Sequence, residues 1–176
     1  METIRDDTTK EKARKFIEIF RGLPDARGTV AGACIKGTLT LEHVLQHLEG
    51  KESLGRYPIF DEKYIKWVAV DFDFKQAADR VALSETHAKE YAKAMFDLGI
   101  KHCWFERSKS GLIHLWTFYR EKVLAEKVRY ILISVAKDLG LKIANGIVEI
   151  FPKQNDVSTG HFGNYISLPY CGALVC

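Results

Sequence analysis

Long hydrophobic segments are absent from this chain of 176 residues. No apolar run approaches the ~20 residues that a membrane-spanning helix needs. The first twelve residues, METIRDDTTKEK, are charged rather than apolar, which argues against a secretory signal. The sequence therefore predicts a cytoplasmic protein without a membrane partner.

Closely spaced cysteines are also missing. The four cysteines are Cys34, Cys103, Cys171 and Cys176, and none of them forms a Cys-x-x-Cys pair. Because structural zinc usually needs such ligand pairs, no structural zinc is expected. The one alternative is a zinc site built from Cys171, Cys176 and His161. In a cytoplasm the thiols are expected to be reduced.

No charge of one sign dominates the composition. The chain has 26 Lys and Arg against 23 Asp and Glu, a net charge of +3, so composition alone does not indicate a nucleic-acid-binding protein. Any basic surface must come from local clusters. The hydrophobic share of 47% is ordinary for a globular protein, and the length fits one domain or two closely packed lobes.

Hydrophobic periodicity predicts helices and strands along most of the chain. Helices are expected at about 8–20, 40–48, 84–98 and 123–139, the third of them capped by Ser84. Strands are expected at 64–74, 100–106, 112–119, 146–151 and 164–168, and residues 25–37 are expected to form a loop or a short strand. The order of elements from residue 64 onward predicts an α+β sheet with helices on one face.

Two aspartates at the end of a strongly apolar strand are the first candidate site. In the segment WVAVDFD, Asp71 and Asp73 are two residues apart, so their side chains share one face of the strand. Two adjacent carboxylates repel each other unless a cation neutralises them, and Mg²⁺ or Mn²⁺ prefers such oxygen ligands. The alternative is a strand end that emerges into solvent, because the D-x-D motif is short and common.

A third carboxylate lies inside another short apolar strand. Glu149 stands between Val148 and Ile150 in GIVEIF, so its side chain faces away from those of its neighbours. Glutamate is almost never buried without a partner, and an edge strand with one solvated face is the alternative explanation. Two aspartates on one strand and an acid on another are the components of a two-metal nucleotidyl-transfer site.

A polar hairpin turn joins the strands at 100–106 and 112–119. The turn combines two cations, two hydroxyl groups and a flexible backbone in Arg107, Ser108, Lys109, Ser110 and Gly111. Phosphate oxygens bind such donors, and glycine permits a close approach of the backbone. His114 follows within the next strand and is predicted to donate to a triphosphate. A solvated turn and a buried core histidine are the alternatives.

The order of these motifs resembles the archaeo-eukaryotic primase superfamily, in particular the primase domains of TOTE-type conflict systems and CRISPR-associated primase-polymerases. The matching segments cover nearly the whole chain and are FRG with Asp25, HLEG, GRYP, VDFD, SKSG with His114 and Trp116, EIFPKQ, and GNYISLP. The resemblance implies an RRM-like catalytic half, about residues 61–176, with a mixed or antiparallel sheet. This half would pack against a smaller N-terminal α/β half, about residues 1–60, in a single catalytic core spanning 1–176.

The resemblance also implies roles for individual residues. Asp71, Asp73 and Glu149 would be the catalytic residues that hold two Mg²⁺ or Mn²⁺ ions. The expected nucleotide-binding residues are Ser108, Lys109, Ser110, Gly111, His114, Lys153 and Asn164. Separately from the resemblance, local clusters of basic residues are the candidate template contacts: Lys12, Arg14, Lys15, Arg21, Arg27 and Lys153. Of these, Arg21 and Arg27 are the expected nucleic-acid-binding residues.

The chain departs from the family pattern at two positions. Leu112 stands two residues before the histidine, where relatives generally have a small residue, so its side chain either crowds the phosphates or turns away. Arg27 lies near a position where related domains often have a tyrosine. If that position senses the sugar, the choice between ribonucleotides and deoxynucleotides stays open.

These observations together predict a template-directed primase-polymerase that joins nucleoside triphosphates on single-stranded DNA, making or extending primers. Its partners would be the nucleotides, the template and primer, and other domains or proteins of the same system. One alternative is a primase-like module that binds nucleotide or nucleic acid with weak or no catalysis. Another is a metal-dependent glycosyltransferase, which also uses a D-x-D motif but needs no acid at Glu149.

Overall fold

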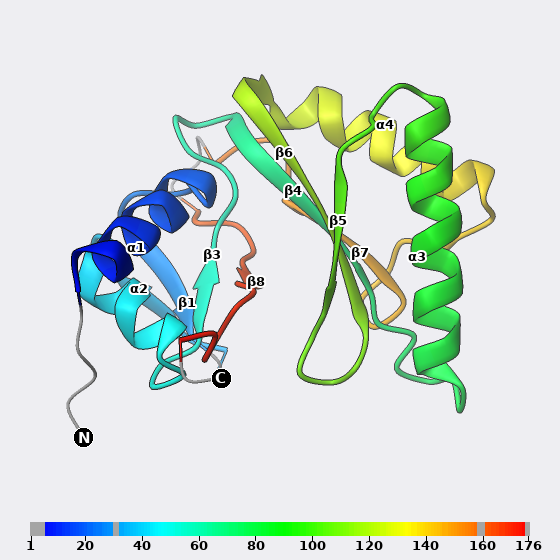
Figure 1. Cartoon of the computed structure of the whole chain (residues 1–176). Coiled ribbons are helices and arrows are strands. Elements are labelled where there is room, and N and C mark those ends of the chain that lie inside the picture. The colour runs from blue at the N-terminus through cyan, green and yellow to red at the C-terminus, as the bar shows by residue number, and fades with distance from the viewer. Residues whose placement is uncertain (1–5, 30–31, 158–160, 175–176) are drawn as a thin grey trace.

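The computed structural model describes residues 6–29, 32–157 and 161–174. This part of the chain contains four helices and two antiparallel four-stranded sheets, so the predicted α+β class is confirmed. Figure 1 shows two lobes, each with its own sheet. None of the described helices is both long and apolar enough to span a membrane.

The first lobe is built around a sheet with the strand order β2-β1-β3-β8. Its elements are α1 (Asp7–Ile19), β1 (Ala26–Thr29), β2 (Cys34–Lys36), α2 (Leu41–Leu48), β3 (Leu54–Arg56) and β8 (Ile166–Ser167). The last strand joins this lobe from far along the chain, because Gly55 of β3 pairs with Ser167 of β8. A tyrosine ring packs on this sheet where glycine leaves room: a Cβ atom on Gly28 or Gly55 would lie within 2.3 Å of the ring of Tyr165.

The second lobe is a β-α-β-β-α-β unit with the strand order β5-β6-β4-β7, which confirms the RRM-like expectation. Its elements are β4 (Tyr64–Phe72), α3 (Arg80–Asp97), β5 (Cys103–Arg107), β6 (Ile113–Leu124), α4 (Ala125–Asp138) and β7 (Val148–Phe151). Both helices cover the same face of the sheet, as the sequence predicted (Figure 1).

Strand alternation gives the second sheet two different faces. Val68, Val70 and Phe72 of β4 face α3 and α4 and belong to one hydrophobic core. Trp67 and Ala69 face the first lobe and belong to a second core. A register shift between Ile65 and Trp67 interrupts this alternation. Ile65 therefore belongs to the helix-facing core, whereas strict alternation would place it on the same face as Trp67.

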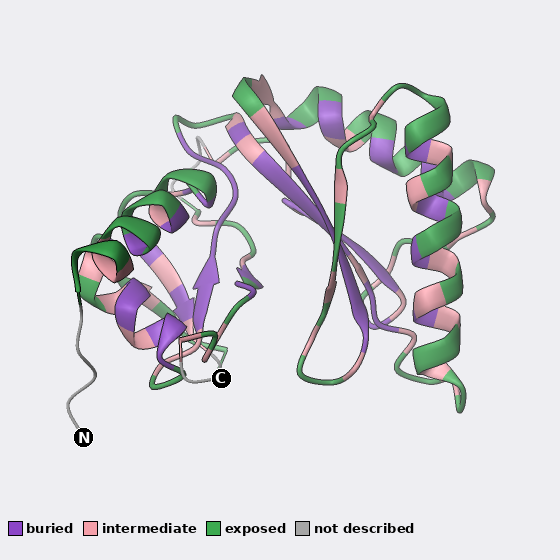
Figure 2. Ribbon diagram, viewed as in Figure 1, coloured by how far each residue is buried: buried purple, intermediate pink, exposed green. Residues whose placement is uncertain are grey.

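The second hydrophobic core is shared by the two lobes. Phe20, which caps the C-terminus of α1, packs edge-on against Trp67 and Trp116 of the second sheet, with ring centroids 5.9 and 5.4 Å away. Ile166 of β8 and Phe151 of β7 belong to the same core. Figure 2 shows that β3 of the first lobe and β4 of the second consist mainly of buried residues. Because this core is common to both sheets, it fixes the first lobe over one face of the second sheet.

The start of the third helix differs from the prediction. α3 begins at Arg80, and Ser84 lies buried within the helix instead of capping it. The Ser84 hydroxyl accepts a hydrogen bond of 2.8 Å from the backbone N–H of Ile113, the first residue of β6. Ser84 therefore attaches α3 to the strand that carries His114.

Candidate metal and nucleotide site

One polar side chain from each strand of the second sheet forms a row across the face toward the first lobe. Glu149 of β7 pairs with Asp71 of β4, Asp71 pairs with His114 of β6, and His114 pairs with Glu106 of β5. These four residues are called the polar row. Antiparallel partners directly opposite each other project to the same face, so strand register alone brings the four side chains together.

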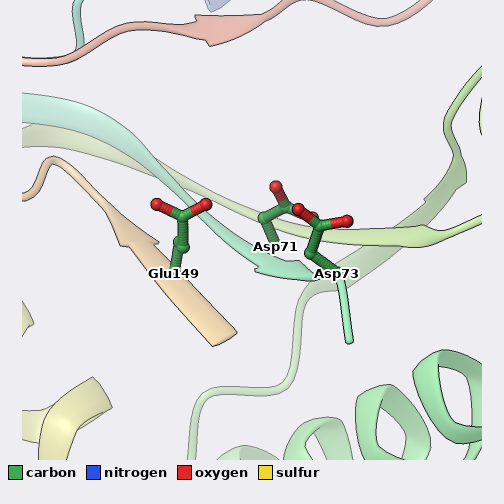
Figure 3. A group of neighbouring side chains, drawn as sticks. All are labelled: Asp71, Asp73 and Glu149. Atoms are coloured by element: carbon green, nitrogen blue, oxygen red, sulfur yellow. The ribbon is translucent and has the colours of Figure 1, made fainter. Parts of the chain in front are cut away.

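Asp73, just beyond the end of β4, adds its carboxylate to those of Asp71 and Glu149. Its backbone N–H donates to the carbonyl oxygen of Ile147 at 2.8 Å, which continues the pairing toward β7. One carboxylate oxygen from each of Asp71, Asp73 and Glu149 lies within 4.8 Å of the others. Figure 3 shows the three side chains projecting to the same side of the sheet.

Burial and repulsion act on the three acids. Burial raises the pKa of Asp71 to about 6; His114 opposes this shift, while the charges of Asp73 and Glu149 add to it. Lys75 forms an ion pair of 2.9 Å with Asp73, and Lys153 forms an ion pair with Glu149. Two lysines thus offset part of the negative charge at the edges of the group.

His114 lies between two carboxylates. Its Nδ1 atom is 2.9 Å from the Oε2 atom of Glu106, and its Nε2 atom is 3.6 Å from the Oδ1 atom of Asp71. Burial disfavours the charged ring, but the hydrogen bond with Glu106 and the charge of Asp71 outweigh burial and raise the pKa of His114. Glu106 also accepts a 2.8 Å hydrogen bond from the indole N–H of Trp116. Glu106 therefore fixes the orientation of the imidazole from the edge strand.

The predicted phosphate-binding turn connects β5 to β6 beside the polar row. It is closed by a 2.8 Å hydrogen bond from the N–H of Ser108 to the carbonyl of Leu112. Arg107 donates to the carbonyl of Gly111 at 2.9 Å and forms an ion pair with Glu85 of α3. Arg107 thus holds the turn in place, while Lys109 is exposed at its tip.

A cleft of about 510 Å³ lies between the lobes above these groups. The second lobe contributes Asp71, Asp73, Lys75, Arg80, Glu106, Arg107, Ser108, Lys109, Ser110, Leu112 and His114. The first lobe and the segment that follows β8 contribute Ser53, Ser167, Leu168, Tyr170 and Cys171. This cavity is called the interlobe cleft. Glu149 instead lines an adjoining cavity of about 280 Å³, together with Lys153 and Arg129.

The structure brings most predicted site residues together but leaves three apart. Asn164 is exposed two residues before β8 and does not line the interlobe cleft. Arg21 lies over the ring of Phe60, 4.6 Å from its centroid, and its carbonyl accepts from Trp67. Arg27 is half-buried in β1. The predicted nucleotide or nucleic-acid contacts of these three residues therefore stay predictions.

Three charged residues of the cleft were not predicted from the sequence. Glu106 holds His114, Lys75 pairs with Asp73, and Arg80 adds a cation at the first residue of α3. The ion pair of Lys75 with Asp73 could have been predicted, because the two residues are only two positions apart in the sequence. Leu112, the departure from the family pattern, has an exposed fraction of 2%, so little of its side chain faces the cleft.

The three carboxylates fit a divalent metal ion. They offer only oxygen atoms, they are largely buried, and their mutual repulsion is relieved by a cation, which are the properties that suit Mg²⁺ or Mn²⁺. Within the described residues, no other group of three or more His, Cys, Asp or Glu could hold a metal ion. Cys176, part of the alternative zinc site, lies outside the described residues.

The fold and the site define a class: an RRM-like sheet that carries three carboxylates able to hold a metal ion, beside a cleft lined with side chains that can donate to phosphate. Residues 34–174 match the family described as TOTE conflict system, Archaeo-Eukaryotic Primase domain, and the chain belongs to that family. No protein of curated function matches the chain. Membership supports a primase-like nucleotidyltransferase function with nucleotide and nucleic-acid substrates.

Proposed function

We propose that the protein is a template-directed primase-polymerase, which joins nucleoside triphosphates on single-stranded DNA and makes or extends primers. The observation that carries the proposal is a group of three neighbouring carboxylates, two of which line the same cleft as the polar hairpin turn. Metal-binding oxygens beside phosphate-binding donors are the two components that phosphoryl transfer requires. Membership in the primase family supports the same reaction class.

Asp71, Asp73 and Glu149 would hold the metal in this reaction. Two divalent ions, when bound there, would supply a lowered pKa at the primer 3′-hydroxyl and charge compensation for the pyrophosphate leaving group. The protein's own task is to keep the three carboxylates deprotonated and close together. Lys75 and Lys153 serve this task because each pairs with one of the acids.

The triphosphate would lie along the hairpin turn. Lys109 at the tip, the hydroxyl groups of Ser108 and Ser110, and the imidazole of His114 all line the interlobe cleft. Charged donors bind phosphate oxygens more strongly than neutral ones, so His114 and Lys109 are expected to contribute most to nucleotide affinity. The same groups would stabilise the charge that develops on the phosphates during transfer.

The direct test is incubation with single-stranded DNA, labelled nucleotides and either Mn²⁺ or Mg²⁺, with products separated on a gel. We expect extended products from the wild-type protein and none from Asp71→Ala or Glu149→Ala. Asp138→Ala, a change of an exposed acid on α4, is the matched control and should retain activity. Circular dichroism should show that all variants are folded. Wild-type activity in either active-site variant would overturn the metal-site assignment.

Two further outcomes separate the proposal from its alternatives. Metal-dependent nucleotide binding without any joining would identify a binding module rather than a polymerase. Turnover of a nucleotide sugar that persists in Glu149→Ala would identify a glycosyltransferase. Both outcomes would contradict the proposed reaction.

A further inference from the structure

A second cavity, lined mainly by aromatic side chains, opens beside the interlobe cleft. It has a volume of about 390 Å³ and lies between α1 and the exposed edge of the second sheet. Its principal walls are Phe16 and Ile19 on one side and Trp104, Trp116 and Phe118 on the other, with Tyr170 at one end. This cavity is called the aromatic groove. It shares Glu106 and Tyr170 with the interlobe cleft, so the two cavities are neighbours.

Three aromatic side chains of the groove, Trp104, Phe105 and Tyr170, are at least half exposed, although several of their neighbours are buried. Trp104 and Tyr170 have exposed fractions of 50% and 64%, whereas the exposed fraction of Trp116 is 2%. Tyr170 also has a φ angle of +67°, a conformation that is uncommon for a bulky residue. An exposed tryptophan on an edge strand promotes association with other molecules, and exposed apolar groups of this kind are typical of binding sites.

The ring of Trp104 is held in place before any ligand arrives. Phe118 contacts it edge-on with a centroid separation of 5.4 Å, and His102 stacks beside it at 6.2 Å. A side chain that is already oriented loses little rotational freedom on binding. Trp104 therefore presents an ordered aromatic surface.

The groove lies at a suitable distance from the polar row. Trp104 pairs with Trp116, and Glu106, two residues further along β5, belongs to the row. Because β5 is two strands away from β4, Trp104 lies roughly 10 Å from the strand that carries Asp71. A strand of nucleic acid can cover that distance with a few nucleotides.

The charges beside the groove suit a polyanion. Lys15 and Lys12 precede Ile19 by four and seven residues on α1, so they lie along the same side of the helix, one and two turns away. Both lysines are exposed. The carboxylate of Glu106 is engaged by His114 and Trp116, which reduces its repulsion of an incoming phosphate.

We propose that the aromatic groove binds single-stranded nucleic acid, with an unstacked base of the template lying on Trp104 and Tyr170. The proposal rests on the proposed function, because it makes the groove the route by which the template reaches the interlobe cleft. Stacking on aromatic side chains tolerates any base, which suits a template of arbitrary sequence. The lysines of α1 bind the phosphates of the same strand.

Intrinsic fluorescence provides the test. Trp67 and Trp116 are buried, with exposed fractions of 0% and 2%, so quenching by an oligonucleotide reports mainly on Trp104. A single-stranded oligonucleotide should quench the wild-type protein in chelator without nucleotide. An abasic strand with the same number of phosphates should quench far less. Equal quenching by both strands would overturn the stacking proposal.

Substitutions measure the contribution of the ring. By anisotropy of a labelled oligonucleotide, Trp104→Ala should weaken binding about 5-fold to 100-fold, the range expected for the loss of one stacked base. Trp104→Phe should retain most of the affinity. Tyr130→Ala, which removes a ring with an exposed fraction of 73% on α4, is the matched control and should have no effect. Unchanged binding by Trp104→Ala would assign the groove to a different ligand, such as a protein segment.

The experiment separates this proposal from the proposed function. Asp71→Ala should lose nucleotide joining and still be quenched by the oligonucleotide, because the groove does not require the metal site. Quenching by a wild-type protein that joins no nucleotides would refute the proposed function and support the groove. If the wild-type protein joins nucleotides and the Trp104→Ala variant binds template normally, only the groove proposal is refuted.

Discussion

Asp71 lies at the centre of the polar row, between Glu149 and His114. Its pKa is about 6 in the folded protein, compared with 3.8 ordinarily, so the folded state binds this proton more tightly than the unfolded state does. The contribution of protonated Asp71 to the free energy of unfolding is complete below about pH 4 and is lost as the pH rises through about 6. At neutral pH the metal-free carboxylate therefore destabilises the fold.

Asp71→Asn should consequently stabilise the metal-free protein at neutral pH. We expect a gain on the order of 2 kcal/mol in the free energy of unfolding at pH 8, which shrinks toward zero at pH 4. Urea unfolding in the presence of chelator measures this difference. A gain that is larger at pH 4 than at pH 8 would contradict the sign of the shift.

Glu106 is a positioning residue, because it contacts His114 rather than the expected position of the nucleotide. Glu106→Gln preserves the size of the side chain and removes its charge, so the imidazole is held less firmly. Nucleotide affinity should fall about 3-fold to 10-fold, the scale of one ordinary hydrogen bond. Titration of a fluorescent nucleoside triphosphate measures the change, and Mn²⁺ affinity without nucleotide is the control.

A double-substitution cycle identifies the route of this effect. If Glu106 acts through the imidazole, His114→Ala should cost less affinity in the Glu106→Gln background than in the wild-type protein. Additive losses would show that the two residues act separately.

The hairpin between β5 and β6 illustrates how elements position the site. Its base is attached to α3 by Ser84, whose hydroxyl accepts from the N–H of Ile113. Ser84→Ala would leave this buried N–H without its partner. We expect a loss of about 1–3 kcal/mol in the free energy of unfolding, measured by urea denaturation. Thr86→Ala, at an exposed position of the same helix, should change stability much less.

At the element scale, the sequence predicted the features that depend on local patterns better than those that depend on long-range strand pairing. The alternation in β4 and β7 correctly predicted which strand face carries Asp71 and Glu149, because side-chain direction has a period of two residues. Glu106 was missed because its importance depends on the register between β5 and β6. The start of α3 was predicted at Ser84 because serine is a common N-cap residue, and the sequence does not show that its hydroxyl accepts from Ile113 instead.

At the scale of the whole molecule, the destination of the last strand was equally hidden. The sequence predicted strands at 146–151 and 164–168, and it contained no signal for their different partners. β7 pairs with β4 in the second sheet, whereas β8 pairs with β3 in the first. Sheet partners so far apart in sequence are set by packing, here by Ile166 in the shared core.

The modest net charge bears on how the whole molecule holds a template. With a net charge of +3, few phosphate contacts are available, and clusters such as Lys12 and Lys15 must supply them. The affinity for single-stranded DNA should fall as salt rises, with a log–log slope shallower than about −4, at roughly −0.7 per contact. Anisotropy across a salt series measures the slope. A slope steeper than −4 would reveal a larger basic surface.

The return of β8 to the first sheet also determines the order in which the protein is completed during synthesis. The strands and helices of the second lobe, from Tyr64 to Phe151, form one continuous stretch of chain. The first sheet, which starts earlier, still lacks its fourth strand when that stretch is finished. Ser167, Leu168 and Tyr170, which form one wall of the cleft, emerge only afterwards. A nascent chain that has just passed Phe151 therefore already carries all three carboxylates, whereas the wall of the cleft formed by residues 167–170 is made later.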